Sequence, residues 1–195
     1  MNTPTQQGVT LIVLAAGNGE RFRAAGGKQG KLHSPFTTQR GTYTVLEHVL
    51  HAVKASGLAW HVVEPTHTQH LSIQGMGSSI ATGISATANA KGWLILPADL
   101  PLIQPETLCR LASALSDHDV VAPIVEGERG HPVGFSKICQ SDLLALQGDQ
   151  GARHIIGKYG LHLIECEDAG CILDVDTPEA LATAQHIALS ASPKA

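Results

Sequence analysis

A glycine-rich, basic segment follows the first apolar run of the chain. The run VTLIVLAA, residues 9–16, ends at Gly17 and Gly19, and the next residues include Arg21, Lys28 and Lys31. Glycines at the end of a buried strand expose backbone N–H groups to a phosphate chain, and lysine and arginine supply the matching positive charge. This combination predicts a nucleotide site.

Two common nucleotide motifs do not fit this segment. Residues 17–22 begin like a dinucleotide fingerprint, but the third glycine is missing and Arg21 stands where a small residue is needed. A phosphate-loop NTPase needs Gly-Lys-Ser/Thr, which neither Gly27-Lys28-Gln29 nor Gly30-Lys31-Leu32 provides. A looser loop that wraps a triphosphate remains, with an ordinary surface turn as the alternative.

Two aspartates follow apolar segments that we expect to be strands. Asp99 comes after Trp93–Leu96, and Asp176 comes after Cys171–Val175. Ligands of such sheets gather at the carboxyl ends of the strands, so both carboxylates could converge on one Mg²⁺, which prefers oxygen ligands. Asp176 also precedes a helix start, and Asp174 could replace it as a ligand.

Strands and helices alternate along the chain, which is typical of a mostly parallel sheet covered on both faces. Apolar runs predict seven strands, at Thr10–Ala15, Trp60–Glu64, Trp93–Pro97, Val120–Ile124, Val133–Ser136, Leu161–Cys166 and Cys171–Val175. Residues 125–130 form a turn pattern between two of them, so part of the sheet is expected to be antiparallel.

Helix signals lie between these strands. Thr44 and Glu47 form a capping-box pattern ahead of an apolar helical face. Pro105 suits the first turn of a second helix, and a last helix should begin near residues 177–179 and end before residue 190.

Composition sets broad limits. The 195 residues are 43% hydrophobic, so a single domain, 1–195, is expected, with a core at about 9–189 and polar ends at 1–8 and 190–195. A net charge of −4 without a basic tract argues against a nucleic-acid surface. The apolar runs are strand-sized and the start lacks signal-peptide features, so we expect no membrane partner and a cytoplasmic protein. Cysteine and histidine spacings do not favour zinc.

Six motifs occur in order from Leu11 to about Ala182. The first is Leu14-Ala15-Ala16-Gly17-Asn18-Gly19-Glu20-Arg21-Phe22 followed by Lys31-Leu32. The other five are Gly75-Met76-Gly77-Ser78-Ser79, Pro97-Ala98-Asp99-Leu100-Pro101, Gly130-His131-Pro132-Val133, Gly148-Asp149-Gln150-Gly151-Ala152-Arg153 and Asp174-Val175-Asp176-Thr177-Pro178-Glu179. Together they resemble nucleotidyltransferases of the molybdenum cofactor type, and the Ala-Ala-Gly form is similar to that of molybdenum cofactor cytidylyltransferases.

The resemblance implies an α/β, three-layer, Rossmann-like nucleotidyltransferase fold with a mostly parallel sheet and a small antiparallel part. It implies catalytic roles for Arg21, Lys31 and Asp99, with Asp99 and Asp176 as Mg²⁺ ligands and Lys28 as an alternative to Lys31. The implied nucleotide-binding residues are Leu14, Ala15, Ala16, Gly17, Asn18, Gly19, Lys28, Gly75, Ser78 and Ser79. The implied acceptor-binding residues are His131, Pro132 and Arg153.

The loop Gly75–Ser79 precedes an expected helix of small residues at 80–90. Its glycines would let backbone groups approach a pyrimidine, while Ser78 would cap the helix. The choice of cytosine rests on Ala15-Ala16 through the resemblance alone.

The implied activity is transfer of CMP from CTP to the phosphate of molybdopterin or its molybdenum-loaded form, with release of pyrophosphate. A molybdenum hydroxylase would then receive the dinucleotide cofactor. Three alternatives stay open: transfer to another small phosphate, such as a sugar or isoprenoid phosphate; a carrier that binds the finished dinucleotide without turnover; and a pyridine-nucleotide oxidoreductase.

Overall fold

A computed structural model describes residues 8–17, 19–28, 30–39 and 41–190, so the predicted site residue Asn18 lies outside the described residues. Within these ranges the main sheet has seven strands. Their order is β4 (Ala59–Val63), β1 (Val9–Leu14), β5 (Gly92–Pro97), β8 (Val133–Ser136), β6 (Val120–Val125) and β7 (Glu128–Arg129), and β9 (His162–Glu165) pairs with β6. Strands β4, β1 and β5 are mutually parallel, as are β6 and β9, whereas β8 and β7 run antiparallel to their neighbours. The predicted mostly parallel sheet with a small antiparallel part is confirmed.

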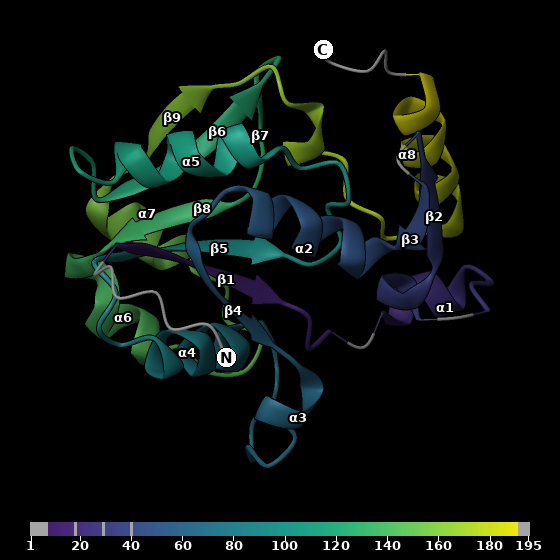
Figure 1. The fold of residues 1–195 in the computed structure, drawn as a ribbon. Helices are drawn as coiled ribbons and strands as arrows, with labels where there is room; N and C mark the ends of the chain where they lie inside the picture. Colours follow the sequence, from purple (N-terminus) through teal and green to yellow (C-terminus); the bar gives the residue numbers. More distant parts are fainter. Residues whose placement is uncertain (1–7, 18, 29, 40, 191–195) are drawn as a thin grey trace.

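Helices cover both faces of this sheet, which gives three layers (Figure 1). Side chains of α2 (Val45–Ala55) and α5 (Pro105–Ala114) pack on one face. Those of α4 (Met76–Ala86), α6 (Gln140–Leu144) and α7 (Arg153–Tyr159) pack on the other. A short helix, α3 (Pro65–Thr68), lies before α4. No helix in the described ranges has the length and apolar character needed to cross a bilayer.

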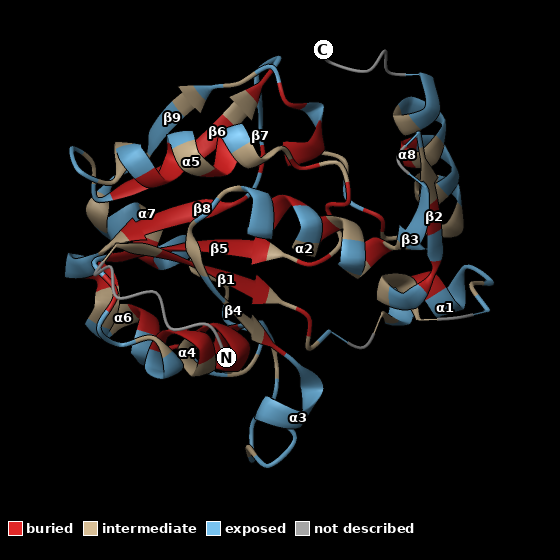
Figure 2. Cartoon of the chain, viewed as in Figure 1, coloured by how far each residue is buried: buried red, intermediate tan, exposed pale blue. Residues whose placement is uncertain are grey.

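The central strands are buried on both sides, as the red strands of Figure 2 show. Leu11 and Val13 of β1 belong to one core, whereas Ile12 between them belongs to the other. This alternation follows from the two-residue period of a strand, and it explains why the sequence of β1 is an unbroken apolar run.

The predicted helix starts are confirmed for two helices on this scaffold. Thr44 and Glu47 form the capping box of α2, and Pro105 occupies the first turn of α5. The capping box satisfies two backbone donors that the first turn of a helix leaves without partners.

A third core lies beyond the carboxyl ends of β1 and β5. It joins the helix α1 (Glu20–Ala24), the hairpin β2 (Pro35–Thr38) and β3 (Gly41–Thr44), and the C-terminal helix α8 (Pro178–Ser190) (Figure 1). Its buried side chains are Phe22, Phe36, Val45, Val175 and Ala184. Elements from both ends of the chain therefore pack together next to the strand ends.

The predicted strand Cys171–Val175 is wrong. A 3-10 turn occupies Ala169–Cys171, and no strand follows it before α8 within the described residues. The backbone here pairs with loops instead of a strand: His131 N–H donates to Cys171 O, and Val175 N–H donates to Asp99 O, both at 2.9 Å. Cys171 and Val175 are buried although the segment does not extend the sheet.

The helix expected from residue 80 begins earlier, at Met76, so Ser78 lies in its first turn and is not its cap. The capping position is occupied by Gly75. The missed hairpin β2–β3 has little apolar signal, because only one face of it packs on the third core.

Candidate active site

The candidate site lies where β1 and β5 end. Ala98 N–H donates to Leu14 O at 3.2 Å, so the loops that follow the two strands begin side by side. Asp99 leaves the end of β5, and the chain after β1 leads through Gly17 into α1, which carries Arg21. The 3-10 turn Lys31–His33 then brings Lys31 back to the same edge.

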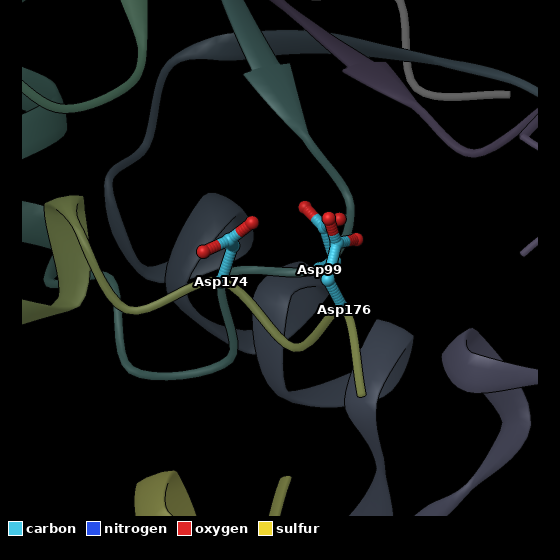
Figure 3. Close-up of side chains that lie close together, drawn as sticks. All are labelled: Asp99, Asp174 and Asp176. Atoms are coloured by element: carbon cyan, nitrogen blue, oxygen red, sulfur yellow. The ribbon is translucent and has the colours of Figure 1, made fainter. Parts of the chain in front are cut away.

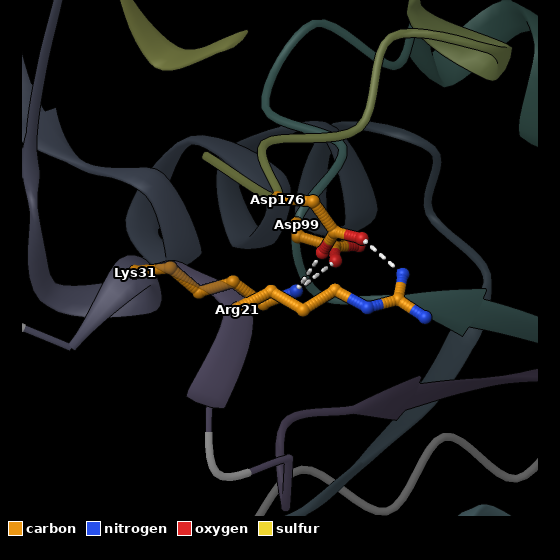
Figure 4. Close-up of polar contacts among 4 residues, drawn as sticks. All are labelled: Arg21, Lys31, Asp99 and Asp176. Carbon is orange, nitrogen blue, oxygen red and sulfur yellow. Dashed lines mark hydrogen bonds and ion pairs between the residues drawn. The ribbon is translucent and has the colours of Figure 1, made fainter. Parts of the chain in front are cut away.

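Four predicted site residues converge here through charged contacts (Figure 4). Lys31 Nζ lies 2.5 Å from Asp99 Oδ2 and 2.7 Å from Asp176 Oδ1. Arg21 reaches the other oxygen of Asp176 at 3.2 Å. The Lys31 and Asp99 side chains are only 16% and 14% exposed, so water weakens their attraction less than at an open surface. Lys28 is exposed and makes no ion pair with a described residue.

Asp174 adds a third carboxylate to this edge. Ligand oxygens of Asp99, Asp174 and Asp176 lie within 4.8 Å of one another, and Figure 3 shows the three side chains side by side. The Oδ1 atom of Asp99 is buried and has no hydrogen-bond partner among the described residues. A buried carboxylate oxygen without a donor is costly, and a bound cation would satisfy it. The donor set of three carboxylates fits a hard divalent cation.

Electrostatic contacts favour the charged forms of Lys31 and Asp176. The hydrogen bond from Lys31 is the main cause that lowers the pKa of Asp176, with burial opposing and Arg21 contributing. Burial acts to lower the pKa of Lys31, but the charges of Asp99 and Asp176 and their hydrogen bonds outweigh it, so the pKa lies above its ordinary value. The lysine is therefore an ammonium at neutral pH, and its partner Asp176 is an anion.

His131 lies in the loop before β8, close enough to Asp99 and Asp174 for their charges to act on its ring. Burial lowers the pKa of His131, the Asp99 and Asp174 carboxylates oppose that shift, and Arg129 adds to it. A cis peptide bond joins His131 to Pro132. The structure therefore places this predicted acceptor residue beside the acidic cluster.

A buried aspartate that the sequence analysis did not identify holds the segment carrying Asp174 and Asp176. Asp168 is 4% exposed, and its two oxygens accept the N–H groups of Gln104 and Gly170 at 2.9 Å each. Gln104 is the residue that caps α5, so the carboxylate ties the segment to that helix. An acidic residue two positions before a glycine was the available signal, but only the fold shows that it is buried.

Other predicted residues lie around the cluster without joining it. Leu14 O and Ala15 N–H are engaged in the sheet, whereas the N–H groups of Ala16 and Gly17 bond to no described backbone group. Gly19 is the capping residue of α1. Arg153 begins α7, is exposed, and makes no hydrogen bond or ion pair with a described residue.

The predicted residues Gly75, Ser78 and Ser79 are engaged within the protein. The Ser78 hydroxyl donates to Ile73 O at 2.7 Å, and the Ser79 hydroxyl donates to Gly75 O at 3.0 Å. Both serines are 7% exposed. Their hydroxyls thus have structural partners within the protein.

A curated protein resembles part of the chain. The purine catabolism protein PucB of Bacillus subtilis (strain 168) is 32% identical over 111 residues. The aligned segment covers 54% of this chain and 54% of PucB, so the chain spans about half the length of that relative.

Solved structures share the fold over most of the chain. The nucleotidyl transferase Mth528 of Methanothermobacter has a TM-score of 0.76 at 18% identity and covers 93% of this chain and 98% of its own. The manganese complex of Rv0371c from Mycobacterium tuberculosis H37Rv has a TM-score of 0.67 at 20% identity and covers 92% and 98%. The molybdopterin-guanine dinucleotide biosynthesis protein A of Archaeoglobus fulgidus has a TM-score of 0.63 at 15% identity and covers 91% of this chain and 97% of its own.

A family model describes most of the sequence. The model of the MobA-like NTP transferase domain matches residues 11–163, which include β1, the Asp99 loop and the strands up to β9. Asp174, Asp176 and α8 lie beyond the matched range. Since the match covers well over half of the chain, the protein belongs to the family of MobA-like NTP transferase domains.

Proposed function

We propose that the protein transfers CMP from CTP to the phosphate of molybdopterin or its molybdenum-loaded form. The observation that carries the proposal is the convergence of Arg21, Lys31, Asp99 and Asp176 at one edge of the sheet. Two cations beside a cluster of carboxylates are what a triphosphate and its metal ion require. Membership of the MobA-like family supports the reaction class.

In the proposed reaction, a phosphate oxygen of the acceptor attacks the α-phosphorus of CTP. One P–O bond forms, the bond between the α-phosphorus and the bridging oxygen breaks, and pyrophosphate leaves with the electron pair. The acceptor oxygen is already anionic, so the step needs no general base. Lys31 and Arg21 orient the triphosphate and stabilise the charge that develops on its oxygens.

A divalent cation fits the acidic cluster, and we propose Mg²⁺. Asp99 and Asp176 would hold it, with Asp174 close enough to assist. When bound, the ion supplies neutralisation of phosphate charge. The manganese complex of Rv0371c supports the use of a divalent cation by this fold.

The acceptor side of the site allows a second candidate substrate. His131 lies beside the carboxylates, but Arg153 contacts no described residue through a polar group. The donor half of the site would serve a sugar or isoprenoid phosphate equally well, so transfer to another small phosphate is the second candidate.

The test is pyrophosphate release by the purified protein with CTP or GTP, Mg²⁺ and molybdopterin, with and without molybdate. We expect release with CTP, little release with GTP, and loss of release in Asp99→Ala. Parallel reactions with sugar and isoprenoid phosphates test the second candidate.

Three results would contradict the proposal. Release only with another phosphate acceptor would move the second candidate to first place. Tight binding of the finished dinucleotide without any release would identify a carrier, and tight NAD(P) binding would favour an oxidoreductase.

A further inference from the structure

Two loops interlock at the start of α4. The glycine loop is residues 75–79, and the capping loop is residues 147–151. Gly148 O accepts the N–H of Gly77 at 2.7 Å, and Gly148 N–H donates to the Ser78 hydroxyl at 2.9 Å. That hydroxyl donates in turn to Ile73 O at 2.7 Å, so Ser78 links the two loops to the chain before α4.

The glycines of the first loop are required by this contact. Gly75 has a φ of 143°, and a Cβ there would lie 2.3 Å from the carbonyl carbon of Gly148. A Cβ on Gly77 would lie 2.6 Å from Gln150 O. The loops therefore touch through their backbones, and a side chain at either glycine would separate them.

This contact determines which backbone groups at the start of α4 are accessible to a ligand. Helix α4 follows the parallel strand β4 and leads to β5, so its first turn lies at the edge of the sheet that carries Asp99. The Gly148 carbonyl already accepts N–H groups of that turn, which a phosphate would otherwise use. The capping loop therefore covers the first turn of α4 at this edge and continues into Arg153 at the start of α7.

We propose that the capping loop is part of the donor-nucleotide pocket and that Ser78 is the residue that positions it. This inference rests on the proposed function and adds to it. The resemblance implies an acceptor role for Arg153, which directly follows this loop, so the two interlocked loops would border both substrates. Ser78 acts through the loop and not by contact with CTP.

The test compares wild type with Ser78→Ala, Ser78→Thr and the matched control Thr82→Ala. Thr82 lies one turn further along α4, and its hydroxyl donates only to Ser78 O, at 2.8 Å. We expect Ser78→Ala to raise KM for CTP and for the acceptor roughly tenfold, with kcat changed less than about threefold. Ser78→Thr keeps the hydroxyl and should restore both values, and Thr82→Ala should match wild type.

Hydrogen exchange supplies a readout that does not depend on turnover. CTP with Mg²⁺, without acceptor, should protect residues 145–152 in wild type, and this protection should be lost in Ser78→Ala. Protection by acceptor alone, or a Ser78→Ala variant that changes only the melting temperature, would overturn the inference while leaving the proposed function intact. A wild-type protein that neither binds nor turns over any nucleoside triphosphate would overturn both.

Discussion

At the scale of single residues, the Lys31 ammonium lies between Asp99 and Asp176, where a metal ion bound by both carboxylates would also lie. Its ammonium contacts one oxygen of each carboxylate. The sequence analysis placed Lys31 among the catalytic residues and kept Lys28 as its alternative. Only the fold separates them, since the 3-10 turn places Lys31 at the carboxylates and leaves Lys28 exposed.

Replacing this lysine should separate catalysis from metal binding. We expect Lys31→Ala to lower kcat/KM by about 10²–10³, because a charge that stabilises the transferring phosphate is lost. The same change should tighten Mn²⁺ binding, because the ammonium no longer competes for the carboxylates. Pyrophosphate release and a Mn²⁺ titration measure the two effects.

The matched variant Lys28→Ala should lower kcat/KM much less, since that side chain is exposed. Weaker Mn²⁺ binding in Lys31→Ala would contradict the view that lysine and metal compete. An equal loss of kcat/KM in Lys31→Ala and Lys28→Ala would contradict the view that only Lys31 acts on the phosphate.

The acid stability of the protein should depend on Asp176. Its pKa is lowered in the folded state, so its pairing stabilises the fold above the unfolded-state pKa of about 3.9 and is lost as the pH falls through the folded value. We expect the melting temperature to fall less steeply below about pH 4 in Asp176→Asn than in wild type. Thermal unfolding across the acid range measures this, with the exposed Asp117→Asn as control. Identical slopes in wild type and Asp176→Asn would show that the pair adds no stability.

At the scale of elements, the regular strands were predictable and the segment that completes the site was not. Strands such as β5 are buried on both faces, so their apolar runs identify them. Cys171–Val175 has the same apolar character, yet its backbone groups bond to the loops of His131 and Asp99. Such contacts join residues far apart in the chain, and local sequence carries no signal of them.

The candidate site was predictable to a similar degree. Residue chemistry together with the family resemblance selected Arg21, Lys31, Asp99 and Asp176 as candidates, and their side chains do lie together in the fold. Ser78 was expected to cap α4, but the carbonyl of Gly148 caps the first turn instead. Because this carbonyl comes from another loop, the sequence around Ser78 gives no signal of it.

Asp168 should anchor the segment that carries Asp174 and Asp176. Asp168→Ala removes the acceptor of two N–H groups at a buried position, which costs about 2 kcal/mol of unfolding free energy. Because the segment is then held less firmly, Mn²⁺ affinity should fall as well. Urea unfolding and a Mn²⁺ titration measure both changes.

The control for this change is Asp117→Ala at an exposed position outside the site. Destabilisation of Asp168→Ala with unchanged Mn²⁺ affinity would show that Asp168 supports the fold but does not position the acidic cluster.

At the scale of the whole molecule, the site joins the two ends of the chain. Arg21 belongs to α1 near the start, whereas Asp176 directly precedes α8 near the end. Their ion pair and the third core hold these elements together, and Gln185 of α8 accepts the N–H of Thr37 at 3.0 Å. The family match ends at residue 163, so Asp176 and α8, which take part in these contacts, lie outside it.

Binding of CTP with Mg²⁺ should therefore stabilise α8, although α8 itself is not expected to touch the nucleotide. A ligand that binds only the folded state adds about 2.7 kcal/mol of stability at 100 times its Kd, and the addition reaches each element whose opening disrupts the site. Hydrogen exchange of residues 178–190 should slow when CTP and Mg²⁺ are added together, and Gln185→Ala should speed exchange there without ligand. If the nucleotide protected only the loops after β1 and β5 and left residues 178–190 unchanged, α8 would be a cover that opens independently of the site.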